Sequence, residues 1–354
     1  MSSKKKVLFI LPNLNSGGAE RVTINYLRQL DPSKYEITLL VFNKTADLFG
    51  LIPEAIRLID IGTNSTSKSI WPLLRNIYNI SPDIIYTSHS RVATLLMILK
   101  PFVLKFKHIA RMQGTPSLDI KYKEYGKFSQ FLFSLGFKSA DVVIAQTKEM
   151  KADAIKCFSI NSGKVIVLNN PIDSFFIDAQ KIMSASPFHS EYISAVASGR
   201  LKDEKGFDVL IKSLPKVIEK YPNFRLYILG DDRGALNQLK SLVNDLCLLD
   251  TVQFEGFIEN PYVYYAHSDM FILSSRREGF PNVLLENYYL NTPIVATRCV
   301  PVVEKLIEND VNGFICSVDN VVELSESIIK CIDLDRNRVS NQDYQGSSLE
   351  VLFE

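Results

Sequence analysis

Short runs of apolar and β-branched residues alternate with longer amphipathic segments along almost the whole chain. In the first half, strand-like runs lie at 7–11, 36–42, 56–61, 83–88, 107–112, 141–146 and 164–170, and helix-like segments at 19–30 and 70–80. This alternation is typical of βαβ units, in which helices cover both faces of a parallel sheet. It predicts a doubly wound α/β domain over residues 1–170.

A second alternating series predicts a further doubly wound domain over residues 192–345. Its strand-like runs lie at 193–199, 224–230, 252–257, 270–275, 293–297 and 313–317, and its helix-like segments at 206–220, 234–247, 260–267, 301–308 and 321–332. Residues 171–191 show little periodicity and contain two prolines, which favours an interdomain linker. Residues 346–354 read GSSLEVLFE and are interpreted as the remnant of an expression tag, outside the fold.

The composition excludes several classes of protein. With 354 residues and 46% hydrophobic residues the chain can bury two cores, yet no apolar run reaches the roughly 20 residues that cross a bilayer. The five cysteines form no Cys-x-x-Cys pair, which indicates reduced thiols in the cytoplasm, and the four histidines show no metal-ligand spacing. Basic residues exceed acidic ones in the first half and the reverse holds in the second, so the first half is expected to face an acidic partner.

The stretch from Arg277 to Leu290 reads REGFPNVLLENYYL and combines a tight turn with a helix start. Because proline suits the first turn of a helix, we expect a helix to begin at or beside Pro281. Such a start directs backbone N–H groups towards an anion or a cluster of hydroxyls. Glu278 would lie on the entering loop and Glu286 on the helix, although each carboxylate alone is compatible with an ordinary structural role.

One glycine-containing loop follows the first strand of each predicted domain. Residues 15–21 read NSGGAER, where two glycines let the backbone approach a ligand, and they match neither a dinucleotide-binding fingerprint nor a Walker loop. Residues 199–206 read GRLKDEKG and supply a guanidinium and an ammonium, Arg200 and Lys205, which can stabilise the charge of a departing diphosphate. The charged side chains between these two are interpreted as solvated: Lys202, Asp203 and Glu204.

Together these motifs resemble family 4 of the glycosyltransferases, in which the SGGAER string, the G-R-x4-K-G element and the Glu-x7-Glu pattern follow one another in this order. The resemblance spans the chain up to the apparent tag. It implies the GT-B fold, with two Rossmann-like domains facing a central cleft, an acceptor-binding first domain and a donor-binding second domain. It also implies a retaining transferase that uses a nucleotide-diphospho-sugar and requires no metal.

The resemblance assigns roles to individual residues. Arg200 and Lys205 would stabilise the leaving diphosphate, Glu278 would hold sugar hydroxyls and Glu286 would bind the ribose. The complete donor-binding set implied in this way is Gly17, Gly18, Arg200, Lys205, Phe257, Ile258, Glu278, Gly279, Phe280, Pro281, Asn282, Val283 and Glu286, of which Arg200, Lys205 and Glu278 are catalytic. Phe257 and Ile258 would lie beside the nucleobase.

At one point the sequence departs from the family. Many members carry a histidine after a first-domain strand near the donor sugar, whereas Met112 and Gln113 occupy the corresponding stretch here. The candidates for contacts with the acceptor or the sugar are therefore Glu20, His89 and Gln113.

The SGGAER and EGFPNVLLE strings are similar to those of bacterial enzymes that use UDP-hexoses or UDP-N-acetylhexosamines. We therefore expect transfer of a hexose or N-acetylhexosamine from a UDP-sugar to a lipid-linked glycan acceptor in bacterial surface polysaccharide or glycan biosynthesis. Three alternatives stay open: a GDP-mannose-dependent mannosyltransferase, a nucleotide-sugar 2-epimerase of GT-B fold, and a non-catalytic glycosyltransferase-like partner subunit. No cofactor and no nucleic acid partner are expected.

The first domain also contains segments rich in lysine and aromatic residues. Residues 100–107 read KPFVLKFK and residues 121–138 read KYKEYGKFSQFLFSLGFK. Cations beside exposed aromatic side chains suit an anionic membrane surface or a polyprenyl-phosphate acceptor, although many of these apolar residues must pack on the sheet. The expected location is cytoplasmic, with peripheral association at the inner face of the cytoplasmic membrane.

Overall fold

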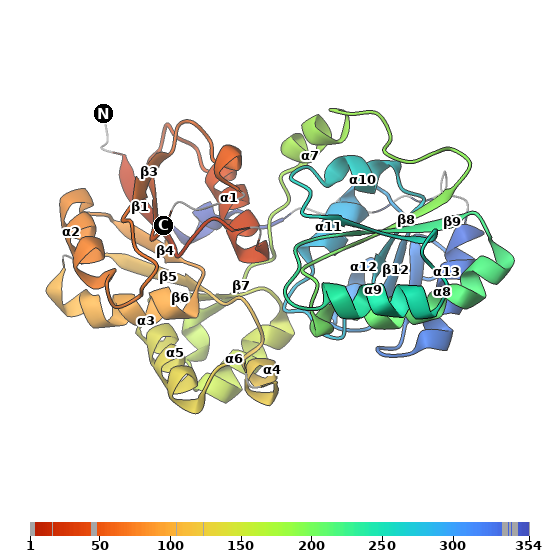
Figure 1. Ribbon diagram of the computed structural model, residues 1–354. Coiled ribbons are helices and arrows are strands. Elements are labelled where there is room, and N and C mark those ends of the chain that lie inside the picture. The colour runs from red at the N-terminus through yellow and green to blue at the C-terminus, as the bar shows by residue number, and fades with distance from the viewer. Residues whose placement is uncertain are drawn as a thin grey trace. The chain divides into compact units, whose positions relative to one another are not determined.

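The computed structural model describes residues 4–15, 17–43, 48–103, 105–122, 124–334, 339, 341 and 346–353. The chain divides into two compact units, Met1–Asp173 with Gln345–Glu354, and Ser174–Tyr344 (Figure 1). Each unit contains one parallel sheet packed between helices. The predicted α/β class with two doubly wound domains is therefore confirmed.

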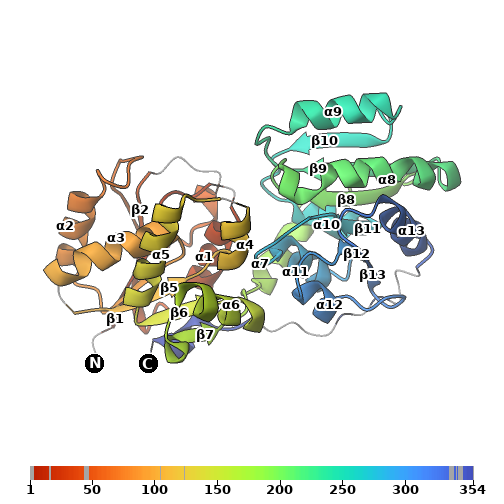
Figure 2. The same ribbon diagram turned by 90° about the horizontal axis from the view of Figure 1, so that it is seen from below.

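The first unit has a seven-stranded sheet in the order β3-β2-β1-β4-β5-β6-β7. Its strands are β1 (Lys5–Leu11), β2 (Tyr35–Val41), β3 (Arg57–Asp60), β4 (Ile84–Thr87), β5 (Lys107–Arg111), β6 (Val142–Ala145) and β7 (Val165–Val167). Its α-helices are α1 (Gly18–Gln29), α2 (Ile70–Ile80), α3 (Ser90–Leu99), α4 (Pro116–Lys121), α5 (Lys127–Ser139) and α6 (Lys148–Phe158). One face of the sheet packs on α1, and the other packs on α2, α3, α5 and α6 (Figure 2).

The second unit has a six-stranded sheet in the order β10-β9-β8-β11-β12-β13. Its strands are β8 (Ile193–Ser198), β9 (Phe224–Leu229), β10 (Val252–Gly256), β11 (Met270–Leu273), β12 (Ile294–Thr297) and β13 (Gly313–Cys316). Its α-helices are α7 (Ser174–Lys181), α8 (Phe207–Lys220), α9 (Leu236–Asp245), α10 (Tyr262–His267), α11 (Asn282–Tyr289), α12 (Val302–Leu306) and α13 (Val321–Ile332). Helices α8, α9 and α13 share one core with the sheet, and α10 packs on the opposite face through Tyr265 and Phe271.

An aspartate anchors the central strand pair of each sheet at its amino end. The Asp83 carboxylate, directly before β4, accepts the backbone N–H of Lys6 on β1 at 2.8 Å. The Asp269 carboxylate, directly before β11, accepts the backbone N–H of Ser194 on β8 at 2.7 Å. Hydrogen bonds from a backbone N–H to an ionised carboxylate are stronger than neutral ones, so both contacts help to fix the register of parallel pairing.

Residues 171–191 differ from the predicted linker. The boundary between the units falls between Asp173 and Ser174, and helix α7 belongs to the second unit. The α7 residue Phe176 packs edge-on against Tyr262 of α10, with ring centroids 6.0 Å apart. Farther along, Phe188 packs on Tyr227 at 4.7 Å. These ring contacts, which the weak periodicity concealed, attach α7 and Phe188 to the second unit.

Residues 346–353 also pack on the fold, contrary to the expectation that 346–354 lie outside it, and Glu354 is outside the described residues. Residues Leu349–Leu352 form a short 3-10 helix, η6. Leu349, Leu352 and Phe353 are buried in the core beneath α1, and the Phe353 ring packs against Tyr35 at 5.2 Å. Their apolar side chains explain this packing, whether or not the residues come from an expression tag.

A buried histidine makes the first unit sensitive to acid. His108 on β5 is fully buried, and its Nε2 lies 3.0 Å from Thr87 Oγ1. Burial and, to a smaller extent, the nearby Lys100 cation together lower the pKa of His108 to about 3, although the Asp141 carboxylate opposes them. Below about pH 6.5 the unfolded chain therefore binds a proton that the folded chain excludes, so the free energy of unfolding should decrease as the pH falls.

We expect this group to lower the free energy of unfolding of the first unit by about 2 kcal/mol between pH 7 and pH 5. Hydrogen exchange of the β4 and β5 amides at pH 7, 6 and 5 measures the loss after correction for the intrinsic pH dependence. The His108→Gln variant, which has no titrating ring, should lose this contribution. An identical pH dependence in the variant would exclude His108 as its source.

Candidate functional site

In the second unit, the loop that contains Arg200 and Lys205 and the loop that contains Glu278 meet at the carboxyl end of the sheet. Strands β8 and β11 are neighbours, although β9 and β10 lie between them in sequence. The loop 199–206 leaves β8, and the loop 274–281 leaves β11. In an open parallel sheet, ligands bind where the strand order reverses in this way. The sequence therefore folds so that these loops share the ligand-binding edge of the sheet.

Lys205 and Glu278 form an ion pair at this edge. Lys205 Nζ lies 2.6 Å from Glu278 Oε1, and the two side chains are only 16% and 11% exposed. Ser275 Oγ donates to the same carboxylate oxygen at 2.7 Å. Because the charges are largely shielded from water, the pair holds both groups in a defined geometry while an anion or hydroxyls can still approach its exposed side.

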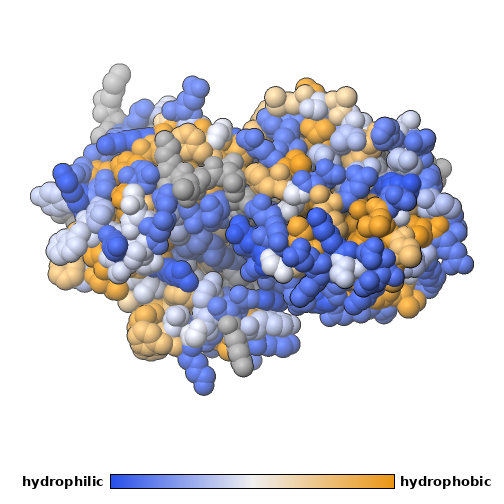
Figure 3. Space-filling view, viewed as in Figure 1, coloured by the Kyte–Doolittle hydropathy of each residue, from blue (hydrophilic) through white to orange (hydrophobic). Residues whose placement is uncertain are grey.

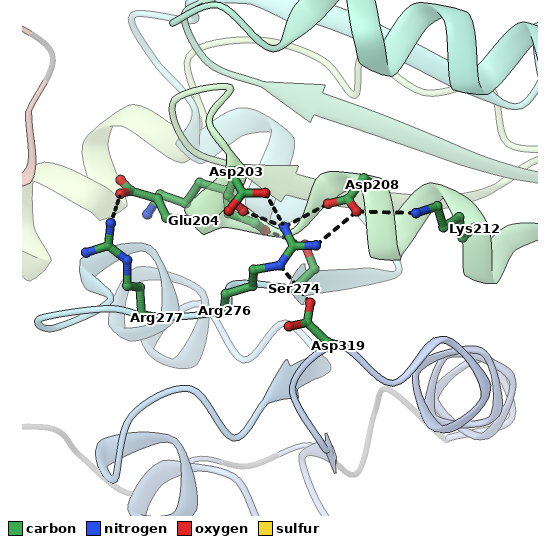
Figure 4. A network of polar contacts seen from close by, with 9 residues as sticks. Asp203, Glu204, Asp208, Lys212, Ser274, Arg276, Arg277 and Asp319 are labelled. Atoms are coloured by element: carbon green, nitrogen blue, oxygen red, sulfur yellow. Dashed lines mark hydrogen bonds and ion pairs between the residues drawn. The ribbon is translucent and has the colours of Figure 1, made fainter. Parts of the chain in front are cut away.

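Arg200 lies on the same loop as Lys205 and is more exposed. Its Nη2 is 3.8 Å from Glu204 Oε1, and its side chain is 48% exposed. Glu204 also contacts Arg277, whose Nη2 lies 3.2 Å from Oε2 (Figure 4). The interpretation of Glu204 as a solvated side chain is therefore wrong: it is 18% exposed because two arginines share its carboxylate.

Helix α11 begins where the sequence predicted. Pro281 is its N-cap residue, and the helix runs over Asn282–Tyr289. Gly279, Asn282 and Val283 are partly exposed on its approach and first turn, whereas Phe280 and Pro281 are buried. Glu286 lies one turn into the helix and is only 7% exposed. The positive end of the helix dipole therefore adjoins the Lys205–Glu278 pair along the chain.

Two further groups of this edge were not found from the sequence. Arg276 contacts Asp203, Asp208 and Asp319, as described below. Cys299 follows β12, and burial raises the pKa of its thiol to about 12, with the Glu278 carboxylate adding to the rise. The thiol is therefore neutral beside the ion pair. Both residues lie within three positions of the end of a buried strand, which is the one local signal that could have indicated them.

Phe257 and Ile258 lie at the same edge of the sheet but farther along it. They follow β10, which is the outer strand beyond β9 and β8, and both are partly buried. Gly256 before them adopts a φ of +71°, a left-handed conformation that suits glycine. The structure thus places these residues on a turn at the ligand edge, separate from the Lys205–Glu278 pair.

In the first unit, the structure brings Glu20 and His89 together. Glu20 lies in the first turn of α1, after β1, and His89 follows the neighbouring strand β4. His89 Nε2 is 3.2 Å from Glu20 Oε1, and His89 Nδ1 is 3.2 Å from Ser88 Oγ. Glu20 is 7% exposed, so its carboxylate is nearly buried against the imidazole.

Gly17 of the first motif makes room for this pair. A Cβ on Gly17 would collide with the Glu20 carboxylate, which folds back over the loop. Gly18 begins α1, and Ser16 lies outside the described residues. Gln113 follows β5 on a separate loop and is partly buried. Glu20 and His89 therefore form a cluster, and Gln113 shares only the carboxyl edge of the same sheet.

The lysine- and aromatic-rich segments form part of the surface over α3, α4 and α5. Phe133 and Phe137 pack inward, as the structural interpretation predicted, and Gly136 lets α5 approach the backbone of α3 at Thr94 closely. Other large side chains of these helices and of the turn after α3 point to solvent: Ile98, Phe102, Ile120, Tyr122, Phe128 and Phe131. Exposed lysines surround them: Lys105, Lys121 and Lys127. Lys123 lies outside the described residues.

In Figure 3, apolar side chains are visible on this side of the first unit, around the position of α3 and α5 in Figure 1. Within the part of the chain that the structure describes, no helix is both long and apolar enough to cross a membrane. In the same residues, no three His, Cys, Asp or Glu side chains are grouped so that they could hold a metal ion.

Comparison with known families covers nearly the whole chain. Residues 16–174 match the model described as Glycosyltransferase Family 4, and residues 178–346 match Glycosyl transferases group 1. An uncharacterized glycosyltransferase of Methanocaldococcus jannaschii is 31% identical over 69% of this chain, a match that spans 64% of the relative. A Campylobacter jejuni relative is 28% identical over 94% of this chain and 92% of its own length. Its name is N-acetylgalactosamine-N,N'-diacetylbacillosaminyl-diphospho-undecaprenol 4-alpha-N-acetylgalactosaminyltransferase.

Solved structures show the same architecture. HepE of Anabaena, crystallised with UDP and glucose, aligns with a TM-score of 0.77 and 20% identity over 95% of this chain and 91% of its own. WaaG, a glycosyltransferase involved in lipopolysaccharide biosynthesis, aligns with a TM-score of 0.72 and 16% identity over 92% and 90% of the two chains. The two doubly wound units thus have the GT-B fold. More closely, the chain belongs to the family 4 type of glycosyltransferases.

Proposed function

We propose that the chain is a retaining hexosyl- or N-acetylhexosaminyltransferase that moves a sugar from UDP to a lipid-linked glycan in bacterial surface polysaccharide or glycan biosynthesis. The assignment of the donor site rests on the 2.6 Å contact between Lys205 and Glu278. This contact joins the proposed diphosphate-binding loop to the proposed sugar-binding loop. The relatives support the substrates: HepE binds UDP and glucose, and the Campylobacter jejuni enzyme is named for a diphospho-undecaprenol substrate.

The proposed reaction needs charge stabilisation at the diphosphate. The acceptor hydroxyl attacks the anomeric carbon on the face from which UDP departs, so the configuration is retained. The bond from this carbon to the phosphate oxygen breaks with its electron pair on that oxygen, which takes up the hydroxyl proton. Arg200 and Lys205 offset the developing negative charge and take the place that a metal ion has in other transferases.

The remaining donor residues would hold the sugar and nucleoside. Glu278 and the backbone N–H groups of residues 279–283, except at Pro281, which has none, bind sugar hydroxyls. The buried Glu286 accepts hydrogen bonds from the ribose. Phe257 and Ile258 provide the turn beside the base. Gly17 and Gly18 are the proposed donor contacts of the first unit, since glycine lets a backbone approach a ligand closely.

Binding of nucleotides tests the donor assignment. In isothermal titration with UDP-sugars and GDP-mannose, we expect the chain to bind the UDP-sugars. We expect the Glu286→Gln variant to bind them about tenfold more weakly, since a charge-assisted hydrogen bond to the ribose becomes a neutral one. Selective binding of GDP-mannose would favour a mannosyltransferase, and conversion of donor without acceptor would favour the epimerase. Binding without any turnover would favour a non-catalytic subunit.

The Glu20–His89 pair is the candidate acceptor site, and Gln113 is a further candidate on the same edge of the sheet. A carboxylate fixes the imidazole, whose ring can then orient an attacking hydroxyl. We expect His89→Gln to raise the KM for the acceptor about tenfold or more while donor affinity stays unchanged, because one oriented hydrogen bond is lost. Steady-state kinetics with both substrates varied separates these effects. An unchanged acceptor KM would remove this pair from the acceptor site.

The surface over α3, α4 and α5 is the candidate for peripheral attachment to the inner face of the cytoplasmic membrane. Exposed aromatic side chains can enter the interface while lysines contact anionic lipid. We expect the chain to sediment with vesicles that contain phosphatidylglycerol, and the double variant Phe128→Ser, Phe131→Ser to do so about tenfold less well, because buried apolar area is lost. The control is Phe175→Ser on α7, which is 89% exposed in the second unit. Equal losses in both variants would contradict this assignment.

A further inference from the structure

The Arg276 guanidinium connects three loops of the second unit (Figure 4). Its Nη1 and Nη2 donate to the two carboxylate oxygens of Asp208, at 2.8 and 2.9 Å, where α8 begins. Its Nε donates to Asp319 Oδ1 at 2.7 Å, on the turn between β13 and α13. Nη1 also lies 3.2 Å from Asp203 Oδ1 on the loop after β8. The Arg276 and Asp208 side chains are 21% and 30% exposed, whereas Asp319 and Asp203 are 53% and 91% exposed, so the Asp208 contact is the best shielded of the three.

Backbone contacts align the same loops directly beneath the ion pair. The Arg276 N–H donates to the Glu204 carbonyl at 2.9 Å, and Ser274 Oγ donates to the Lys205 carbonyl at 2.8 Å. Gly206 lies so close that a Cβ on it would collide with the Ser274 carbonyl oxygen. The segments 203–206 and 274–276 therefore pack against each other. The first contains Lys205, and the second leads directly to Glu278.

The chemistry of the three partners requires arginine. A planar guanidinium can donate two parallel hydrogen bonds to Asp208 and a third, in another direction, to Asp319. An ammonium group at this position would act as a point charge and could not reach all of these acceptors in a fixed geometry. Burial raises the pKa of Asp208, but the hydrogen bonds and charge of Arg276 outweigh this effect and hold that pKa below its ordinary value.

We propose that Arg276 is a positioning residue for the donor diphosphate, which acts by holding the loop of Lys205 against the loop of Glu278. It is not expected to contact the donor, because its donors are engaged by Asp203, Asp208 and Asp319. The inference rests on the proposed function, since it assigns a diphosphate ligand to the Lys205 edge. It adds a residue outside the three sequence motifs that suggested that function.

The test measures UDP affinity and loop protection in the full chain. We expect Arg276→Gln to weaken UDP binding in isothermal titration about tenfold or more, and to speed hydrogen exchange in the peptides around 200–206 and 274–280. Arg276→Lys keeps the charge and should lose less UDP affinity than Arg276→Gln. If Arg276→Gln folds poorly, the same measurements on Arg276→Lys replace it. The control is Lys216→Gln, which breaks the exposed Lys216–Glu326 pair of α8 and α13 and should leave both readouts unchanged.

A double-mutant cycle separates positioning from a general loss of stability. If Arg276 acts through Lys205, the loss caused by Arg276→Gln should largely disappear in the background of Lys205→Gln. If the losses in UDP affinity from the two substitutions are additive, the proposal is overturned. It is also overturned if Arg276→Gln speeds hydrogen exchange without changing UDP affinity, or if it leaves hydrogen exchange unchanged. A wild-type chain that binds no UDP-sugar would overturn the proposed function and this inference together. Normal wild-type binding with unaltered Arg276 variants would overturn the inference alone.

Discussion

Replacing Arg200 by alanine is expected to lower donor turnover by about 10³-fold, because the leaving diphosphate loses a charge-assisted contact that strengthens in the transition state. The fold should survive, since the Arg200 side chain is 48% exposed and its contact with Glu204 is 3.8 Å long. Exposed ion pairs of this kind contribute little to stability. Release of UDP at saturating donor and acceptor concentrations measures the loss, and circular dichroism checks the fold.

The matched control for this experiment is Arg225→Ala. Arg225 lies in β9 near the opposite, amino end of the same sheet, where its guanidinium packs over the Tyr192 ring at 4.2 Å from the centroid. The Arg225→Ala substitution removes the same charge from the same unit, away from the ligand edge. It should leave turnover within about twofold of wild type. Undiminished turnover in Arg200→Ala would refute the proposed site, and equal losses in both variants would indicate an effect of net charge.

The Gly206→Ala variant is expected to lose about 3 kcal/mol of stability or more, because strain and a collision act together. Gly206 adopts a φ of +63°, and a Cβ would collide with the Ser274 carbonyl oxygen. The collision involves backbone on both sides, so relief requires that the two loops separate. The melting temperature of the second unit and the rate of UDP release should therefore fall together.

Gly256→Ala is the control for backbone strain alone. Gly256 lies in the same unit with a φ of +71°, and a Cβ there would meet nothing within 4 Å. We expect a loss of only about 1–2 kcal/mol from the left-handed conformation. Thermal unfolding of both variants, compared with wild type, measures the difference. If the two variants lose equal stability, close contact between the loops at Gly206 is not important for the fold.

Local pattern predicted most of the elements that position the site. Strand ends, the start of α11 beside Pro281 and the helices α8 and α13 all follow from periodicity and from proline or glycine at their boundaries. Helices α3, α4, α5 and α6 were not assigned, because their sequences lack a clear amphipathic period. Their burial is decided by tertiary packing, as at Gly136 against Thr94.

The contacts of the site were less predictable than its residues. Lys205 and Glu278 were both named from motifs, yet their ion pair joins positions 73 residues apart. Glu204 illustrates the limit: next to Asp203 it reads as part of a solvated charged loop, and only the fold brings Arg277 to its carboxylate. For Arg276, the partners Asp208 and Asp319 are 68 and 43 residues away, so no local spacing signals the network.

The aspartate anchors of the central strands have a consequence for how each unit is made. The Asp83 contact closes a separation of 77 residues and the Asp269 contact one of 75, and the strands that they align carry the loops of the two candidate sites. Closing such long loops costs chain entropy before any pairing is gained, which makes parallel sheets slow to fold. The geometry of each site should thus appear late during folding, after secondary structure has formed. A kinetically trapped chain could have nearly native helix content and still lack the Lys205–Glu278 and Glu20–His89 pairs.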